Sequence, residues 1–168
     1  HKVTKTECLV RWHHPSYGFI PPDDFIALAE QSGSITLLTQ WVMKTALKQC
    51  QQWRKAGYEI GVAVNISAID LFRGNLQTSV PELLKHYDIP SEMLTIEVTE
   101  SEVMEDPERA YNILRDIKAL GVRLSVDDYG TGYSSLAHLK QLPVHELKID
   151  KSFVMDMSRD KDDATIVK

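Results

Sequence analysis

The sequence is poor in cysteine and has no long apolar run, and each absence excludes a class of protein. Its two cysteines, Cys8 and Cys50, stand far apart in apolar surroundings without a Cys-x-x-Cys spacing, which disfavours a disulfide scaffold or a zinc site and predicts buried thiols in a reducing compartment. The longest uncharged stretch, from Gln31 to Met43, is broken by polar residues, whereas a membrane helix needs about 20 apolar residues. The first residues show no signal-peptide pattern. We therefore expect a cytoplasmic location and no membrane contact from this segment.

Neither sign of charge dominates the composition. The 168 residues include 19 Lys and Arg against 24 Asp and Glu, a net charge of −5, with 43% hydrophobic and 26% charged residues. These values are those of an ordinary globular domain and disfavour a disordered or fibrous chain. We expect no DNA or RNA polymer as a partner.

Short strand-like segments alternate with amphipathic helical patterns along the chain. The expected strands are Glu7–Arg11, Gly61–Ile66, Leu94–Thr99, Arg123–Asp127 and Glu146–Ile149. The expected helices are 22–30, 34–57, 81–87, 107–120, 135–142 and one from residue 163 onward. This alternation predicts βαβ units, a parallel sheet and the α/β class.

Each expected strand has one apolar face and one small or polar face. Because successive side chains point to opposite sides of a strand, six polar side chains share the second face: Glu7, Arg11, Asn65, Glu97, Asp127 and Lys148. An open sheet with helices on both faces is typically apolar throughout. A polar inner face fits a (β/α)8 barrel better, since such a barrel builds its active site at the carboxyl ends of its strands.

The polar set is rich in carboxylates, with Glu100 and Asp128 just beyond strand ends. Carboxylates this close need compensation, and a set without histidine or cysteine favours Mg²⁺ or Mn²⁺. The adjacent Asp127 and Asp128 suggest two ions about 3.5–4 Å apart, the arrangement that serves phosphoester hydrolysis. Arg11 is suited to hold a phosphate, and Lys148 to neutralise charge or orient water.

The same residues resemble the EAL domains, the bacterial cyclic di-GMP phosphodiesterases. The resemblance is carried by five blocks in the family's order, residues 7–15 (ECLVRWHHP), 65–67 (NIS), 96–100 (IEVTE), 127–136 (DDYGTGYSSL) and 142–150 (LPVHELKID). It implies a modified TIM barrel and the Mg²⁺- or Mn²⁺-dependent hydrolysis of cyclic di-GMP to linear pGpG.

The resemblance also implies a role for each site residue. One metal ion would be bound by Glu7, Asn65, Glu97 and Asp127, and a second by Asp127 and Asp128. Arg11 would contact a substrate phosphate, Lys148 would lie near the activated water, and Glu100 would hold the loop after Asp128. That loop, Tyr129 to Ser135, would take part in a homodimer, and a sensor or GGDEF domain is expected upstream.

The chain departs from the family pattern mildly within its motifs and more strongly in length. Cys8, Tyr129 and His145 replace Ala, Phe and Asp. A (β/α)8 barrel typically needs about 250 residues, and only about five strands are recognisable. We therefore expect residues 1–168 to be an incomplete EAL domain that lacks the first and the last barrel strands, with further residues or another chain at its open edges.

Three other interpretations remain open from the sequence. The chain could be an EAL module that binds cyclic di-GMP without hydrolysing it, an inactive fragment, or a barrel enzyme that uses Lys148 to form a Schiff base. Lys148 could also be a plain ion-pair partner, and Arg11 a structural clamp for Glu7.

Overall fold

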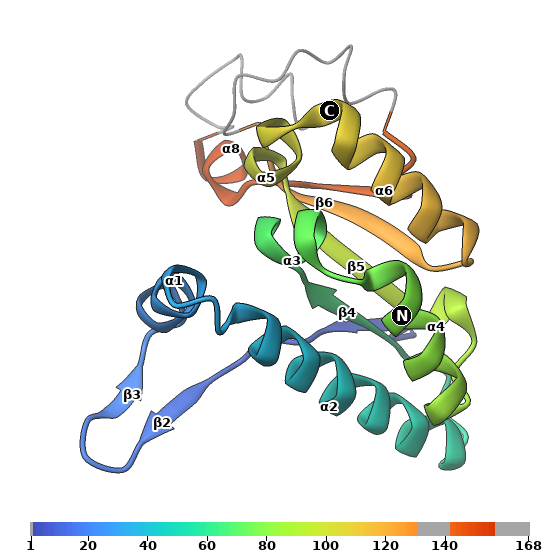
Figure 1. The fold of residues 1–168 in the computed structure, drawn as a ribbon. Coiled ribbons are helices and arrows are strands. Elements are labelled where there is room, and N and C mark those ends of the chain that lie inside the picture. Colours follow the sequence, from blue (N-terminus) through green and yellow to red (C-terminus); the bar gives the residue numbers. More distant parts are fainter. Residues whose placement is uncertain (1, 131–141, 157–168) are drawn as a thin grey trace.

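The computed structural model describes residues 2–130 and 142–156, and it contains a curled, entirely parallel five-stranded sheet (Figure 1). The strand order is β1-β4-β5-β6-β7. The strands are β1 (Lys5–Glu7), β4 (Gly61–Asn65), β5 (Leu94–Thr99), β6 (Arg123–Tyr129) and β7 (Glu146–Ile149). A parallel sheet curled into half a barrel confirms the predicted α/β class and partial barrel.

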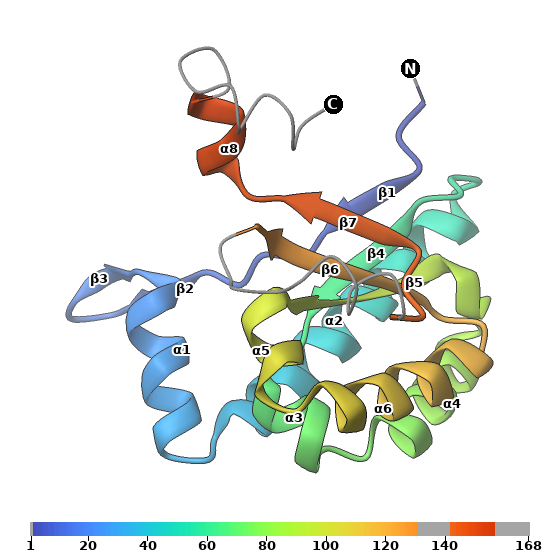
Figure 2. The same cartoon turned by 90° about the horizontal axis from the view of Figure 1, so that it is seen from above.

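Helices cover the apolar face of this sheet, as Figure 2 shows for α2, α4 and α6. The helices are α1 (Pro22–Gln31), α2 (Ile35–Lys55), α3 (Ala68–Arg73), α4 (Leu76–Tyr87), α5 (Glu100–Glu105), α6 (Pro107–Ala119) and α8 (Lys151–Asp156), with a 3-10 turn η1 (Ser91–Met93). In the part of the chain that the structure describes, no helix is long and apolar enough to span a membrane.

The core lies between these helices and the sheet. Leu47 of α2, Leu114 of α6 and Ile96 of β5 are completely buried in it. Apolar strand residues therefore point toward the helices, and by alternation their neighbours point to the inside of the curl.

The two edge strands of the sheet approach each other on the inside of the curl. Lys5 of β1 pairs with Glu146 of β7, and Glu7 of β1 pairs with Lys148 of β7, so the order of charges is reversed between the strands. Residues two apart in a strand point the same way, so both edges direct these charges inward. The curl brings residues separated by 141 positions to one site.

The predicted boundaries differ most from the structure at the first strand and at the helix expected over 81–87. The first strand ends at Glu7, and the chain then forms a hairpin of β2 (Trp12–His14) and β3 (Gly18–Ile20) that projects from the sheet (Figure 1). Helix α4 begins at Leu76, with Pro81 in its interior. Its apolar residues at four-residue spacing, Leu76, Val80 and Leu84, are all buried, and this burial outweighs the one backbone hydrogen bond that proline cannot donate. Residues 135–141 of the helix expected at 135–142, and the helix expected from residue 163, lie outside the described residues.

Candidate metal and catalytic site

Four strands bring a lysine and three carboxylates together at the carboxyl end of the sheet. Lys148 Nζ donates hydrogen bonds to Glu97 Oε2 at 2.6 Å, Asp127 Oδ2 at 3.1 Å and Glu7 Oε2 at 3.2 Å. Asn65 Nδ2 donates to Glu7 Oε1 at 3.1 Å. The structure thus places five of the predicted site residues in one hydrogen-bonded group. Strand register contributes to this arrangement, because Asn65 of β4 pairs with Glu97 of β5.

Glu97 is the most enclosed member of the group. Its side chain is completely buried, and its Oε1 atom has no hydrogen-bond partner among the described residues. Burial raises the pKa of Glu97, and the hydrogen bond from Lys148 opposes this rise. A buried carboxylate oxygen without a partner is costly, so this atom is the strongest indication that the group binds a cation.

The donor set fits a hard divalent ion. Glu7, Glu97 and Asp127 each offer one carboxylate oxygen, and the three oxygens lie within 4.8 Å of one another. Oxygen ligands without histidine or cysteine suit Mg²⁺ or Mn²⁺ better than zinc. The side-chain amide of Asn65 lies beside them, because its Nδ2 donates to Glu7 Oε1.

The lysine is a cation in this environment. Although burial alone would lower the pKa of Lys148, its hydrogen bonds to Glu97, Asp127 and Glu7 raise it above its ordinary value. A protonated ammonium only donates hydrogen bonds, so Lys148 cannot act as a nucleophile at neutral pH. A Schiff-base lysine needs a lowered pKa, and the geometry therefore disfavours that interpretation.

Asp127 and Asp128 are consecutive, yet both carboxylates stay near the rim. The pairing of β6 with β7 shifts between Val126 and Tyr129, and Asp128 has a left-handed backbone with φ of 53°. This irregularity breaks the alternation that would separate neighbouring side chains. Burial raises the pKa of Asp128, and the carboxylates of Asp127 and Asp150 add to the effect; Asp150 also hydrogen bonds to it.

Glu100 contacts the loop that follows β6. It is 1% exposed, and its Oε2 accepts a hydrogen bond of 2.7 Å from the backbone N–H of Gly130. This contact holds the point where the chain leaves Asp128. Of the predicted dimer loop, Tyr129 and Gly130 are described, and residues 131–135 lie outside the described part.

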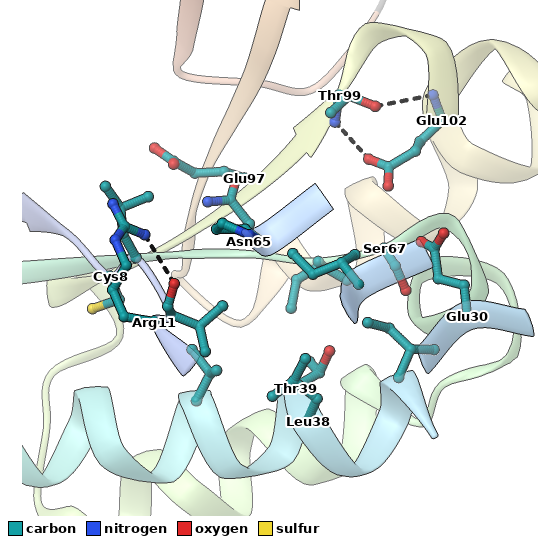
Figure 3. Close-up of a pocket in the computed structure, with 17 residues that line it drawn as sticks. Cys8, Arg11, Glu30, Leu38, Thr39, Asn65, Ser67, Glu97, Thr99 and Glu102 are labelled. Carbon is teal, nitrogen blue, oxygen red and sulfur yellow. Dashed lines mark hydrogen bonds between the residues drawn. The ribbon is translucent and has the colours of Figure 1, made fainter. Parts of the chain in front are cut away.

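Arg11 stands apart from the carboxylate group. Its guanidinium is exposed and donates to the carbonyl oxygen of Val10 at 2.8 Å. It lines a cavity of about 280 Å³ whose wall also includes Asn65 and Glu97 (Figure 3). The cation thus lies beside the site without an ion pair to Glu7 among the described contacts, which disfavours the structural-clamp interpretation.

Two further carboxylates near the site were not predicted. Glu102 binds the backbone at the ends of β4 and β5, and Asp70 accepts hydrogen bonds from the hydroxyls of Thr36, Thr39 and Ser67. Each stands three residues after a hydroxyl residue at a helix start. The Ser/Thr-x-x-acid spacing is the pattern of a helix cap, and it was the sequence signal for both.

Comparison with known families identifies the chain. The EAL domain family matches residues 1–168. The chain belongs to this family. The match confirms the resemblance seen in the five sequence blocks.

Curated relatives of this EAL domain include named phosphodiesterases. MucR of Pseudomonas aeruginosa, a bifunctional diguanylate cyclase/cyclic di-GMP phosphodiesterase, is 43% identical over 162 residues, which cover 96% of this chain and 24% of MucR. The cyclic di-GMP phosphodiesterase PdeR of Escherichia coli is 39% identical, over 94% of this chain and 24% of PdeR. The chain spans about a quarter of the length of these relatives.

Solved EAL structures share the fold. A structure of the MucR phosphodiesterase in complex with cyclic di-GMP matches with a TM-score of 0.91 at 42% identity, covering 98% of this chain and 67% of that chain. The EAL enzyme Bd1971 with bound cAMP and cyclic di-GMP matches with a TM-score of 0.88 at 30% identity, covering 99% of this chain and 46% of that chain.

Proposed function

We propose that this EAL domain hydrolyses cyclic di-GMP to linear pGpG at a site that binds Mg²⁺ or Mn²⁺. The observation that carries the proposal is the buried, unpartnered Oε1 of Glu97 beside the carboxylates of Glu7 and Asp127. The activity named for its relatives MucR and PdeR supports the substrate.

The first ion would be held by Glu7, Asn65, Glu97 and Asp127. When bound, such an ion would polarise a substrate phosphate and lower the pKa of a water molecule. Like-charged carboxylates within 4.8 Å repel one another. The strand positions hold them together, and the Lys148 ammonium offsets part of the repulsion.

The second ion would be held by Asp127 and Asp128. The shift in register after Val126 lets both carboxylates lie at the carboxyl end of the sheet. Asp150, just after β7, lies beside Asp128 and adds negative charge there, which favours a bound cation.

The remaining residues would act on the substrate and the water. Lys148 donates hydrogen bonds, so it orients an oxygen at the reacting phosphate and neutralises negative charge there. Arg11, at the wall of the neighbouring cavity, offers a planar guanidinium that binds phosphate oxygens in pairs. Glu100 fixes the backbone after Asp128 through Gly130.

Hydrolysis and metal binding can be tested together. Cyclic di-GMP incubated with the protein and Mg²⁺ should yield pGpG, and Asp127→Asn should abolish the metal-dependent turnover. Tight binding of cyclic di-GMP without product would instead identify a binding module. Full activity of Asp127→Asn would show that the metal assignment is wrong.

The proposed function extends to the longer protein. The relatives are several times longer than this chain, and the name of MucR includes a diguanylate cyclase. We therefore propose an upstream sensor or GGDEF domain and a homodimer that uses the loop of residues 129–135. Mass measurement of the full-length protein, with and without a deletion of that loop, tests the dimer.

A further inference from the structure

One partly buried carboxylate, that of Glu102, joins the end of β5 to the start of α3, which closely follows β4. Its Oε2 accepts a hydrogen bond of 2.7 Å from the backbone N–H of Thr99, and its Oε1 accepts one of 3.0 Å from the backbone N–H of Ala68 (Figure 3 shows the bond to Thr99). Both oxygens of the side chain are therefore used, and they bind residues 31 positions apart in the sequence.

The two backbone groups lie directly beyond candidate metal ligands. Thr99 is the last residue of β5 and follows Glu97 by two positions, and Ala68 follows Asn65 by three. The backbone N–H of Ile66 donates to the carbonyl of Glu97 at 2.9 Å, which marks the end of strand pairing. Beyond that bond, Glu102 supplies the next connection between β4 and β5.

A helix cap explains only half of this arrangement. Thr99 and Glu102 form the reciprocal capping box at the start of α5, which needs the bond to Thr99 alone. The bond to Ala68 leaves α5 and reaches the first residue of α3, three positions beyond Asn65 at the end of β4. Asp70 of α3 accepts a hydrogen bond of 3.2 Å from the hydroxyl of Ser67, so two carboxylates contact the start of α3.

The environment shows that the carboxylate is held at a cost. Burial raises the pKa of Glu102, with Glu30 nearby adding to the rise, and the hydrogen bonds from Thr99 and Ala68 oppose it. A partly desolvated carboxylate persists where its hydrogen bonds compensate it. Both bonds therefore help to compensate the burial of this carboxylate, and the bond to Ala68 connects α5 to the start of α3.

We propose that Glu102 is a positioning residue for the metal site, which sets the separation of Asn65 and Glu97 by tying the ends of β4 and β5 together. This inference rests on the proposed function, because it takes Asn65 and Glu97 to be metal ligands. Residues that orient metal ligands typically change metal affinity or activity by about 10–100-fold when removed.

The experiment compares three variants with the wild-type protein. Glu102→Ala removes both bonds. Glu102→Gln keeps one of the two acceptor oxygens and places an NH2 donor opposite one of the two N–H groups. Asp106→Ala is the matched control, because Asp106 caps the next helix by accepting a hydrogen bond of 3.2 Å from the N–H of Arg109 and lies outside the contacts that join the two strand ends.

The first measurement is the affinity for Mn²⁺ in the absence of cyclic di-GMP. The electron spin resonance signal of the free ion reports how much Mn²⁺ remains unbound. We expect Glu102→Ala to weaken binding by about 10-fold or more, Glu102→Gln to weaken it less, and Asp106→Ala to leave it within about twofold. Turnover of cyclic di-GMP by Glu102→Ala should recover when Mn²⁺ is raised, because the ligands themselves are intact.

The second measurement needs no metal. The side-chain amide resonances of Asn65, which donates to Glu7, should shift and broaden in Glu102→Ala and stay unchanged in Asp106→Ala. If Glu102→Ala fails to fold, Glu102→Gln supplies the same comparison.

The outcomes separate this inference from the proposed function. A wild-type protein that binds no Mn²⁺ would overturn the metal site, and the Asn65 resonances would still decide whether Glu102 positions that residue. Unchanged Asn65 resonances, or equal Mn²⁺ affinities in Glu102→Ala and Asp106→Ala, would reduce Glu102 to a helix cap.

Discussion

At the scale of single residues, Lys148 allows three carboxylates to lie close together in the folded protein. Its ammonium donates to Glu7, Glu97 and Asp127 at once. Without a cation these three carboxylates would repel one another, and Glu97, fully buried, could not give up its proton readily. The lysine therefore offsets their repulsion and holds the three candidate ligands close together.

Replacing this lysine tests its role in turnover. Lys148→Met removes the ammonium but keeps a side chain of similar length, and loss of one donor at a reacting group typically costs about 10²–10³ in rate. We expect the steady-state turnover of cyclic di-GMP at saturating Mg²⁺ to fall by that factor. Lys44→Met, on the exposed side of α2, should keep wild-type turnover, and an equal rate in both variants would contradict the assignment.

His145, one residue before β7, is a second residue whose role can be tested. Its Nδ1 accepts a hydrogen bond of 3.0 Å from the backbone N–H of Leu124, which only the neutral imidazole can do. Burial lowers the pKa of His145, and the charges of Lys118 and Arg123 lower it further. The unfolded chain therefore binds a proton more readily than the folded protein does near pH 6.

Stability should consequently depend on His145 on the acid side. This contribution is fully present above the unfolded pKa of about 6.5 and is lost as the pH falls below it. Urea unfolding gives the free energy of unfolding at about pH 8 and at about pH 5. The decrease from the higher to the lower pH should be smaller for His145→Asn than for the wild type, because asparagine accepts the same hydrogen bond without titrating. Identical pH profiles would contradict this argument.

At the scale of elements, the alternation of side chains along the strands carried most of the sequence prediction. It placed Glu97, Asp127 and Lys148 on one face, and the structure brings these three together. The same rule extended the first strand too far, to Arg11, because alternation alone does not show where pairing with β4 stops. Alternation also does not predict the orientation of Asp128, since a register shift and a positive φ orient that residue.

The turn after β6 depends on one glycine. Gly130 has φ of 102°, and a Cβ there would lie 2.6 Å from Phe153 Cε2 of α8. Alanine at this position would strain the backbone and displace the loop that Glu100 holds. The loop directly follows Asp128, so the strain would reach the candidate site.

We therefore expect Gly130→Ala to lower both stability and turnover. Gly57→Ala is the control, because Gly57 has φ of 85° and open space around it. It should cost about 1–2 kcal/mol from backbone strain alone, with turnover unchanged. Gly130→Ala should cost about 1–3 kcal/mol more, from overpacking. Urea unfolding measures the first effect and initial rates the second; equal results for the two variants would show that the contact with Phe153 is relieved cheaply.

At the scale of the whole molecule, the curl of the sheet determines both the fold and the charge balance. The reversed pairs Lys5–Glu146 and Glu7–Lys148 join the edge strands β1 and β7. Sequence alone could not show this, because pairs 141 residues apart form only once the sheet has curled. Part of the net charge of −5 lies in this inward-facing group, so it does not argue against an anionic dinucleotide as substrate.

Because ligands from several strands converge, a bound metal should stabilise the entire fold. A ligand that binds only the folded protein raises the unfolding free energy by about 2.7 kcal/mol at 100 times its dissociation constant. We expect Mn²⁺ at that concentration to raise the urea midpoint of the wild type accordingly, and chelation by EDTA to reverse the change. Asp127→Asn should show little of this shift, whereas Asp106→Asn, at a helix cap outside the site, should show all of it. An equal shift in Asp127→Asn would show that the stabilising metal binds elsewhere. Asp127 is the residue to change because its hydrogen bond with Lys148 connects β6 to the group that joins the two edge strands.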